Sequence, residues 1–473
     1  MKKLLTLLIS LLFIFASCGK GSENIRSSSE NSQSRTKTDE IVVPVSKDLA
    51  LSSYEGCMTA DGFYYLKTVE DNEDTGESHT LIMHLNAPSM LEIPLCNKPE
   101  CKHMDDSCNA FVGGSVHGIG SSVIFTDGNK LYLIIVTEDA NATRNFYSKN
   151  SSPDVIVSDE ITVFKGSYGL SQATSIQALY SMNLDGTNHT KLIEFDSGIT
   201  IDTPLAIGGG KIYCIKDKIE VTGQGDGATS IGTSGNSELI CIDIAKKTVT
   251  SLTKTKDKTI IGAYKTLILF EENHSDVDPD TLNSANDSDF LKYYNNMDRM
   301  IISLDTETAE EKTLLKGKTV ELEMPQTDGN IMCYSDRKSK KFKCLNLDTG
   351  ENTEILIANK KNGPYLNKVM DGKLIYYYDD GKNVNAQMDS FFCYDFETRE
   401  STELKLFIKS GEKFSVDIID KIGDSYLVIP KHDEEKENTW AGTIQYNILR
   451  RYYALIKQDD YWNSKPNYKY FEE

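Results

Sequence analysis

The sequence has few of the features that mark an enzyme. Its 473 residues contain only 7 histidines. No G-x-S-x-G turn, no H-E-x-x-H zinc motif and no glycine-rich phosphate loop occurs along the chain. A hydrolase that gathers acids from separate strands leaves no local signature. The missing motifs therefore exclude only the enzyme classes that such motifs define.

Basic charge is also scarce. Lys and Arg number 51 against 71 Asp and Glu, which gives a formal net charge of −20. Because nucleic acids are bound by basic surfaces, this balance argues against a nucleic acid partner. An acidic surface also keeps exported proteins apart in solution. The charge alone therefore points to no particular ligand.

A long apolar run is missing everywhere except near the N-terminus, where Leu4–Phe15 follows the basic Met1–Lys3. This run has about twelve residues, whereas a membrane-spanning helix needs about twenty. A basic start, a short apolar run and small residues before Cys18 are typical of a secretory signal. The sequence therefore predicts a signal peptide over residues 1–17.

The end of this signal resembles the lipobox of bacterial lipoproteins. The resemblance implies that Cys18 receives a diacylglyceryl group and that cleavage follows Ser17, although Phe15 and Ser17 depart from the commonest lipobox residues. An ordinary secretory signal followed by an incidental cysteine is the alternative. We expect the mature chain to be anchored by lipid to the cell membrane, on its extracytoplasmic face.

Residues 18–46 are predicted to form a lipidated cysteine and a flexible tether. The segment Gly19–Glu40 contains one large apolar residue, Ile25, among many Ser, Asn and Glu residues. Such a segment buries too little apolar surface to offset the entropy lost on ordering. It would hold a folded body away from the lipid head groups.

The rest of the chain lacks both linkers and strong helical periodicity, and a short strand motif recurs instead. In each copy a turn with Gly or Asp precedes an apolar strand that is often rich in aromatic residues. The copies are Asp61–Leu66, Asp127–Leu133, Gly210–Cys214, Tyr264–Phe270 (the loosest), Asp328–Cys333, Asp371–Tyr377 and Gly423–Val428. After each copy follows a second unit of strand, turn and strand.

This pattern predicts an all-β protein, a seven-bladed β-propeller over residues 47–473. Length alone suggests two or three domains, but all-β folds often exceed that rule. Units of about four strands cannot bury a core singly, and stacking them around an axis does so while protecting the sheet edges. We expect the ring to close through Ile41–Val43, or the segment before Cys57, beside the final strands near Tyr453–Ile456.

Three segments also resemble a known family. Tyr180–Thr187 looks like the strand-and-turn unit of TolB-type propellers, while Cys96–His103 and Tyr453–Trp462 are more specific. Together they are similar to segments of uncharacterised TolB-like β-propeller lipoproteins of Gram-positive gut anaerobes, a domain-of-unknown-function group. The resemblance implies a propeller in the cell envelope. It implies no reaction, because the family has no agreed activity.

One cluster could carry metal chemistry: Cys96, Cys101, His103 and Cys108, spaced C-x4-C-x-H-x4-C. Three sulfurs and one imidazole suit tetrahedral zinc, and four protein ligands would leave no open position, so the site would be structural. A disulfide among the cysteines is equally compatible with an exported chain. Reduced thiols are a third interpretation, and no other cofactor is expected.

Four further cysteines occupy matching places in the strand repeat: Cys214, Cys241, Cys333 and Cys344. Cys333 and Cys344 would face each other if the hairpin turned at Lys338–Ser339. Such pairs can form cross-strand disulfides where the geometry allows. Buried thiols that act as small apolar side chains are the alternative.

The leading functional hypothesis is a binding or scaffolding module whose ligand is an unknown protein, peptide or glycan, with no catalytic residue assigned. The polar inserts Glu138–Ser175 and Ile219–Ser237 are candidate contact surfaces, with Tyr147 and Tyr168 as anchors. The alternative is an extracytoplasmic hydrolase or lyase acting on glycan or peptide. Buried acids converging on a central channel would favour the enzyme, and an apolar or aromatic patch would favour binding.

Overall fold

The computed structural model describes residues 47–72, 77–115, 122–138, 156–157, 162–163, 175–225, 228–233, 236–255, 258–275, 287–355, 364–378, 391–408, 415–438 and 444–473. The predicted signal peptide and tether lie outside these residues. Residues 43–473 form one compact unit. Within the described ranges, no helix has the length and apolar character that a bilayer crossing requires.

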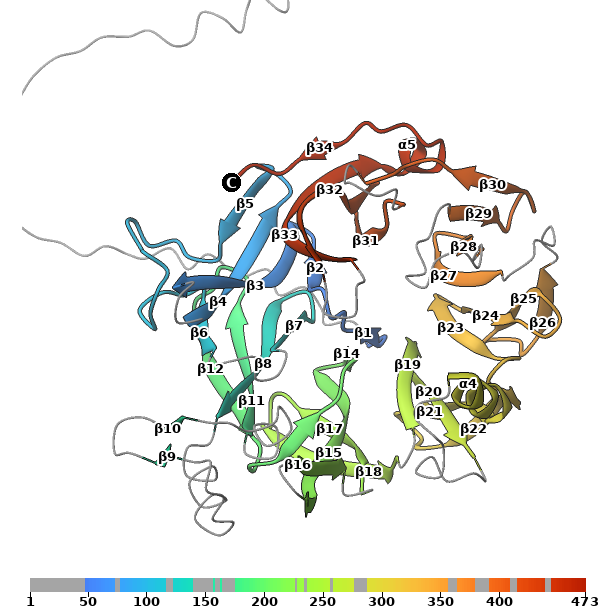
Figure 1. Cartoon of the computed structure of the whole chain (residues 1–473), viewed down its shortest axis with the longest axis horizontal. Helices are drawn as coiled ribbons and strands as arrows, with labels where there is room; N and C mark the ends of the chain where they lie inside the picture. The colour runs from blue at the N-terminus through green and yellow to red at the C-terminus, as the bar shows by residue number, and fades with distance from the viewer. Residues whose placement is uncertain are drawn as a thin grey trace, which may run out of the picture. The chain divides into compact units, whose positions relative to one another are not determined.

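Seven antiparallel sheets follow one another around a common axis (Figure 1), so the predicted all-β, seven-bladed propeller is confirmed. Each blade has four main strands in chain order, and the first of them lies nearest the axis. Blades 1 to 3 are built from β2 (Cys57–Thr59), β3 (Gly62–Asn72), β4 (Glu77–Asn86) and β5 (Leu91–Pro94); β7 (Val123–Thr126), β8 (Lys130–Glu138), β11 (Ser175–Asn183) and β12 (Thr190–Glu194); and β14 (Ala206–Gly208), β15 (Lys211–Gly225), β17 (Glu238–Asp243) and β18 (Thr248–Lys254).

The other four blades repeat this order. They are built from β19 (Lys258–Tyr264), β20 (Leu267–His274), β21 (Asp298–Asp305) and β22 (Glu311–Lys318); β23 (Glu323–Asp328), β24 (Ile331–Asp336), β25 (Lys341–Asn346) and β26 (Asn352–Ile355); β27 (Tyr365–Met370), β28 (Lys373–Tyr377), β29 (Phe391–Asp395) and β30 (Ser401–Leu404); and β31 (Ile418–Ile422), β32 (Ser425–Asn438), β33 (Ile444–Lys457) and β34 (Lys469–Tyr470).

A few elements supplement the blades. They are β1 (Ala50–Leu51), β13 (Ile199–Ile201) and β16 (Ala228–Thr233) in blade 3, β6 (Phe111–Ser115) in blade 1, the hairpin β9 (Ile156–Val157) and β10 (Thr162–Val163), and the helices α4 (Asp287–Asn296) and α5 (Gln458–Trp462). The two helices are short and lie in connections between strands. The blades themselves are entirely β.

The apolar core lies between neighbouring blades rather than within them. One cluster joins side chains of blades 2 and 3, such as Leu179 and Ile240, and another joins blades 6 and 7 through Ile375 and Val428. Because a middle strand has a blade on each side, both of its faces are covered, and the successive residues from Met332 to Asp336 in β24 are all buried. This explains the near-continuous apolar runs of the repeated motif.

The two ends of the strands differ. The first and third turns of each blade share one end, here called the turn face, and the second connection lies at the other end, the insert face. Several turns on the turn face are tight because an Asp or Asn side chain binds their backbone. The Asp305 carboxylate, for example, accepts hydrogen bonds from the backbone N–H groups of Glu307 and Thr308.

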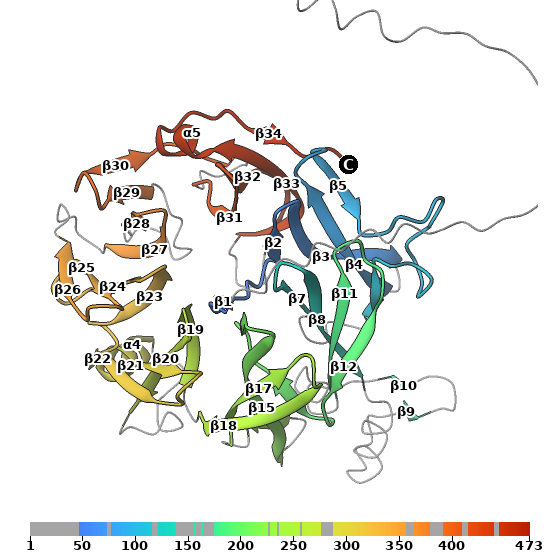
Figure 2. The same ribbon diagram turned by 180° about the vertical axis from the view of Figure 1, so that it is seen from behind.

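The expected closure of the ring through the segment before Cys57 is wrong. That segment instead lies at the centre of the ring (Figure 2), where β1 pairs with β14, the innermost strand of blade 3. The N–H of Ser52 continues the pairing to the carbonyl of Leu205. The reason is that the inner edge of β14 offers unpaired backbone groups facing the axis. Ile41–Val43 lies outside the described residues.

The C-terminal strap, residues Lys469–Glu473, adds backbone contacts between the last blade and the first, whose side chains also share an apolar cluster. Its strand β34 pairs with β33 of blade 7. The N–H of Glu92 in β5 then donates to the carbonyl of Glu472, whose own N–H donates to the carbonyl of Met90. The strap therefore joins the outer strands of blades 7 and 1 by backbone hydrogen bonds.

Candidate metal centre

The cysteine cluster lies in a loop on the outer edge of blade 1. Strand β5 pairs with one half of β4 and β6 with the other half, and the cysteine loop, Leu95–Ala110, leaves the sheet between them. Both ends of the loop are tied to Ile82 of β4. The carbonyl of Ile82 accepts a hydrogen bond from the N–H of Leu95, and the N–H of Ile82 donates to the carbonyl of Ala110.

The loop brings all four predicted side chains together. One ligand atom each from Cys96, Cys101, His103 and Cys108 lies within 4.8 Å of every other. Nδ1 of His103 is 3.1 Å from Sγ of Cys108. Cys108 is buried and the other three residues are half-buried. No disulfide joins these cysteines.

Two of the three sulfurs, those of Cys96 and Cys108, have different electrostatic surroundings. Burial raises the pKa of the Cys108 thiol to about 12, although the backbone N–H of Ala110, 3.3 Å away, opposes the shift. Burial also acts to raise the pKa of Cys96, but the backbone N–H groups of Lys98 and Asn109 outweigh it and leave that pKa below its usual value. Amides aimed at sulfur favour thiolates, which are the form that binds metal.

The cysteine loop also packs against blade 2. Cys96, Cys101 and Cys108 share one apolar cluster with Met182 of β11. A β-carbon at Gly186, in the turn after β11, would lie 2.6 Å from the carbonyl oxygen of Leu95. A cross-link in this loop would therefore act at the junction of blades 1 and 2.

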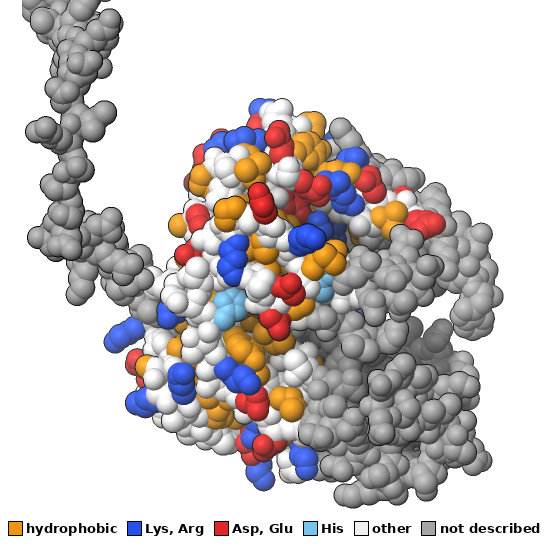
Figure 3. Space-filling model, turned by 90° about the vertical axis from the view of Figure 1, so that its left-hand side faces the viewer, with side chains coloured by type: hydrophobic (Ala, Val, Ile, Leu, Met, Phe, Trp, Pro, Cys, Tyr) orange, Lys and Arg blue, Asp and Glu red, His pale blue; other side chains and the backbone are white. Residues whose placement is uncertain are grey.

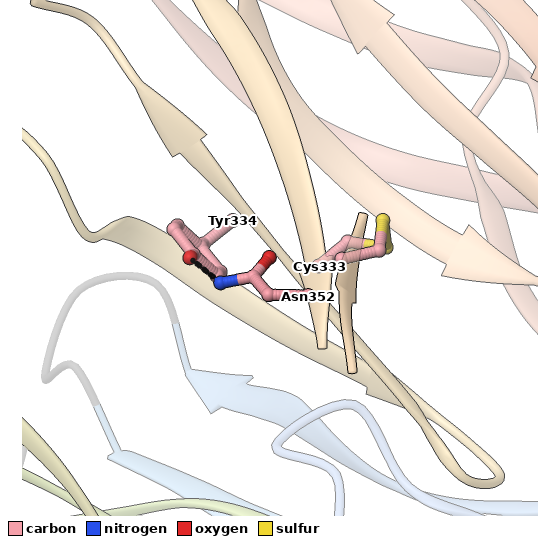
Figure 4. The surroundings of a disulfide bond; sticks show 4 residues. Cys333, Tyr334 and Asn352 are labelled. Carbon is pink, nitrogen blue, oxygen red and sulfur yellow. Dashed lines mark hydrogen bonds between the residues drawn. A yellow bond between two sulfur atoms is a disulfide. The ribbon is translucent and has the colours of Figure 1, made fainter. Parts of the chain in front are cut away.

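Blade 5 contains the disulfide of the described chain, between Cys333 and Cys344 (Figure 4). The two residues are direct partners in the pairing of β24 with β25, and their Cα atoms are 4.1 Å apart. The next residue, Tyr334, accepts a 2.8 Å hydrogen bond from the Asn352 side chain. The disulfide thus links two strands that backbone bonds already hold together.

Cys214 and Cys241 of blade 3 are not joined, although they occupy the matching strands. Cys214 is opposite Ile240, and Cys241 is opposite Tyr213, so the pair is one residue out of register. Because successive side chains of a strand point to opposite faces, the two thiols point to opposite sides of the blade. Both are buried free thiols.

A cavity of about 300 Å³ beside the N-terminal segment was not predicted from the sequence. Its lining includes Asp48 and Ser52 of the N-terminal segment, Asp127 of blade 2 and Asp420 of blade 7. Burial raises the pKa of the Asp420 carboxyl. The alternation of side chains along β31 could have indicated that Asp420 faces inward. The sequence of the N-terminal segment gave no sign that this segment forms one wall of the cavity.

The predicted contact inserts are largely beyond the described residues. Tyr147 and Tyr168 lie there, as does most of Glu138–Ser175. Within Ile219–Ser237 the backbone forms a hairpin of β15 and β16, paired from Ile219 with Thr233 to Gly225 with Ala228. This hairpin extends from blade 3 on the insert face.

No family model matches the sequence, and no curated protein matches it significantly. Among solved structures, the chain is similar to a Mycobacterium tuberculosis puromycin-hydrolyzing peptidase, with 9% identity, a TM-score of 0.46 and coverage of 91% of this chain and 54% of that one. The chain thus spans about half the length of that peptidase.

Two other solved structures are also similar. The β-propeller domain of the Trilobed protease from Pyrococcus furiosus is 12% identical with a TM-score of 0.43, covering 90% of this chain and 99% of that one. TolB from Acinetobacter baumannii is 9% identical with a TM-score of 0.33, covering 86% and 77%. Likeness at this level concerns the fold, and no activity is carried over from it.

Proposed function

We propose that this chain is a lipid-anchored binding or scaffolding module on the extracytoplasmic face of the cell membrane. It would contact a protein, peptide or glycan through its insert face. The observation that carries the proposal is the unequal length of the connections at the two ends of the blades. Loops held by a rigid scaffold are the usual place for recognition.

The difference between the faces is large. Long connections join Glu138 to Ser175, Gly225 to Glu238, His274 to Asp298 and Tyr377 to Phe391, and all of them are second connections of their blades. On the turn face the first turns are as short as Asp328 to Ile331. The insert face therefore varies from blade to blade, while the turn face repeats short turns except between β33 and β34, where α5 lies.

The path of the N-terminal segment is compatible with such an orientation. The N–H of Leu49 donates to the carbonyl of Lys265, which lies in the turn between β19 and β20 on the turn face. The first described residues of the chain therefore contact the turn face.

Surface charge gives such a contact no single preferred sign on the side shown in Figure 3. Acidic, basic and apolar side chains are interspersed there among the described residues. A partner on this side would be selected by local contacts, because no extended field of one sign steers it.

The anchor is tested by expressing the full chain and its Cys18→Ala variant in a Gram-positive host. We expect the variant to be released from the membrane fraction or to stay unprocessed. Normal processing with unchanged membrane retention would refute lipidation.

The contact face is tested on glycan and peptide arrays with the full chain. Replacing residues 139–174 by a short turn should abolish any binding detected. The turn-face variant Lys246→Ala, at an exposed side chain that pairs with half-buried Asp243, should leave it unchanged. Binding that survives loop replacement but is lost in the control would place the contact on the other face.

One observation favours the second candidate, a hydrolase or lyase acting on glycan or peptide. Asp420, whose pKa is raised by burial, lines the same cavity as Asp48 and Asp127. A carboxyl whose pKa is raised by burial is better suited to general-acid work than an ordinary exposed carboxyl. Turnover of a glycan or peptide substrate that Asp420→Asn abolishes would establish this function, and turnover equal in both chains would exclude Asp420.

A further inference from the structure

We propose that Cys96, Cys101, His103 and Cys108 bind one Zn²⁺ ion in a closed structural site. This inference is independent of the proposed binding function, because the site lies on the outer edge of blade 1 and not among the inserts of the insert face.

The donor set matches zinc in both chemistry and spacing. Thiolate sulfur and imidazole nitrogen are the ligands of structural zinc, and a tetrahedron of sulfurs at 2.3 Å places them about 3.8 Å apart. The four donor atoms already lie within 4.8 Å of one another. Small side-chain rotations would therefore complete the coordination without moving the backbone.

A disulfide explains the cluster less well. A disulfide needs two sulfurs, whereas here three sulfurs and an imidazole nitrogen point toward one place. The 3.1 Å contact between His103 Nδ1 and Cys108 Sγ serves no purpose in a disulfide, but it is natural for two ligands of one ion. The N–H of Ala110 also points at the Cys108 sulfur, which suits a metal-bound thiolate.

The loop backbone is shaped to bring the donors inward. Glu100 and His103 both adopt left-handed conformations with φ of 59°. The backbone N–H of Cys101 donates to the backbone carbonyl of Lys98, and the backbone N–H of Cys108 donates to the backbone carbonyl of Asp105. These two turns direct the ligands to the inside of the loop, while Met104 at its tip is 58% exposed.

The ion would hold a segment that packing alone holds weakly. Residues 97–107 are half-buried or exposed throughout, so they contribute little apolar burial. Four protein ligands leave no position for a reacting water, so the site would be structural rather than catalytic. The metal would fix the loop at the junction of blades 1 and 2.

The test begins with the full-length chain purified without chelator. Elemental analysis should find one zinc per chain, and removal of zinc followed by Co²⁺ should give the visible absorption of tetrahedral thiolate-bound cobalt. Cys101→Ser and His103→Ala should each lower the zinc content well below one. Met104→Ala, which changes the same loop at an exposed non-ligand position, should keep one zinc.

Two results would overturn the proposal. One is a wild-type chain without zinc in which peptide mapping finds a disulfide between two of these cysteines. The other is a full zinc content retained in both ligand variants, since the metal must then bind elsewhere. If the ligand variants do not fold, the wild-type chain is tested with Co²⁺ in place of zinc. A spectrum without thiolate-to-cobalt absorption bands would then reject the site. Array binding is measured separately, so failure here leaves the binding proposal intact.

Discussion

Blades 1 and 5 both carry cysteines, but they place them in different surroundings. In blade 5, Cys333 and Cys344 are direct partners on neighbouring strands and form a disulfide. In blade 1, three cysteines and His103 lie in a loop outside the sheet, and their sulfurs are unbonded. In blade 5 the disulfide reinforces strands that are already paired. In blade 1 a cross-link would hold a loop that has no strand pairing of its own.

The outer edges of the two blades differ in the same sense. Blade 5 ends regularly, with β26 paired along β25 from Phe342 to Leu345. The edge of β4 in blade 1 is shared between β5 and β6, and β5 is further held by the C-terminal strap. Blade 1 therefore relies on added contacts where blade 5 relies on regular pairing.

Removing the proposed metal should have the largest effect. Chelation of the wild-type chain, or Cys101→Ser, should lower the free energy of unfolding by about 3–5 kcal/mol, as loss of a metal site commonly does. Denaturant unfolding measures the loss, and hydrogen exchange should locate faster amides in Leu95–Ala110. An unchanged midpoint after chelation would remove the distinction between the two blades.

Breaking the disulfide of blade 5 should cost less. The bond closes a separation of 11 residues, for which chain entropy predicts about 2–3 kcal/mol, so Cys344→Ala should lose about that amount. The matched control is Cys393→Ala in β29, a buried free thiol whose loss should cost about 1 kcal/mol. Equal losses would mean that the bond adds nothing beyond packing. Both are measured by denaturant unfolding without reductant.

Weakening the C-terminal strap should have a smaller effect on blade 1. Phe471 packs against the apolar cluster of that blade. Because it is only half-buried, Phe471→Ala should cost about 1–2 kcal/mol. Its neighbour Tyr470 is 37% exposed, and Tyr470→Ala is the matched control, with a smaller loss. Thermal unfolding measures the stability of both variants. A larger loss for Tyr470→Ala than for Phe471→Ala would show that Phe471 is not the contact that holds the strap on blade 1.

The smallest effect should be an acid-dependent one in blade 5. Burial opposes ionisation of Asp336, but the Lys343 ammonium at 2.8 Å and the Ser339 N–H outweigh it and hold the Asp336 pKa below its usual value. The folded state therefore favours the carboxylate. Its stabilising contribution is complete above the ordinary aspartate pKa of about 3.9 and is lost as the pH falls through the lower folded value.

Asp336→Asn should remove that acid dependence. Its unfolding free energy should change less steeply than that of the wild type from about pH 4 downward. Unfolding by denaturant at a series of pH values measures the slope. Glu354→Gln is the control, because the pair of exposed Glu354 with half-buried Lys341 should contribute little. Parallel curves for wild type and Asp336→Asn would show that this buried pair is not coupled to folding.

The seven blades could be predicted because their signals are local. Alternating apolar residues and the turn residues after them act within a few positions, as in Asp371–Tyr377, which forms the turn into β28 and the strand itself. The convergence of Cys96 with Cys108 was also within reach of the sequence, because short spacings limit where a loop can go. Strand register followed from the turn at Lys338–Ser339, around which Cys333 and Cys344 are paired.

The closure of the ring and the lining of the cavity could not be predicted from such local signals. The residues of β1 give no sign that they pair with β14, more than 150 positions away, because any unpaired edge offers the same backbone groups. The one-residue offset between Cys214 and Cys241 likewise depends on the hairpin that joins their strands. Because β1 pairs with β14, the N-terminal segment forms one wall of the cavity.

By itself, the sequence determined the class of fold, the number of blades and the spacing of the cysteine loop, because strand alternation, turn chemistry and short loops act between near neighbours. Only the tertiary structure decided which edge the N-terminal segment fills, how Phe471 and Glu472 join the last blade to the first, and which acids line the cavity. Those outcomes depend on contacts between distant residues, and backbone hydrogen bonds of equal strength are available at several edges until the blades close around the axis.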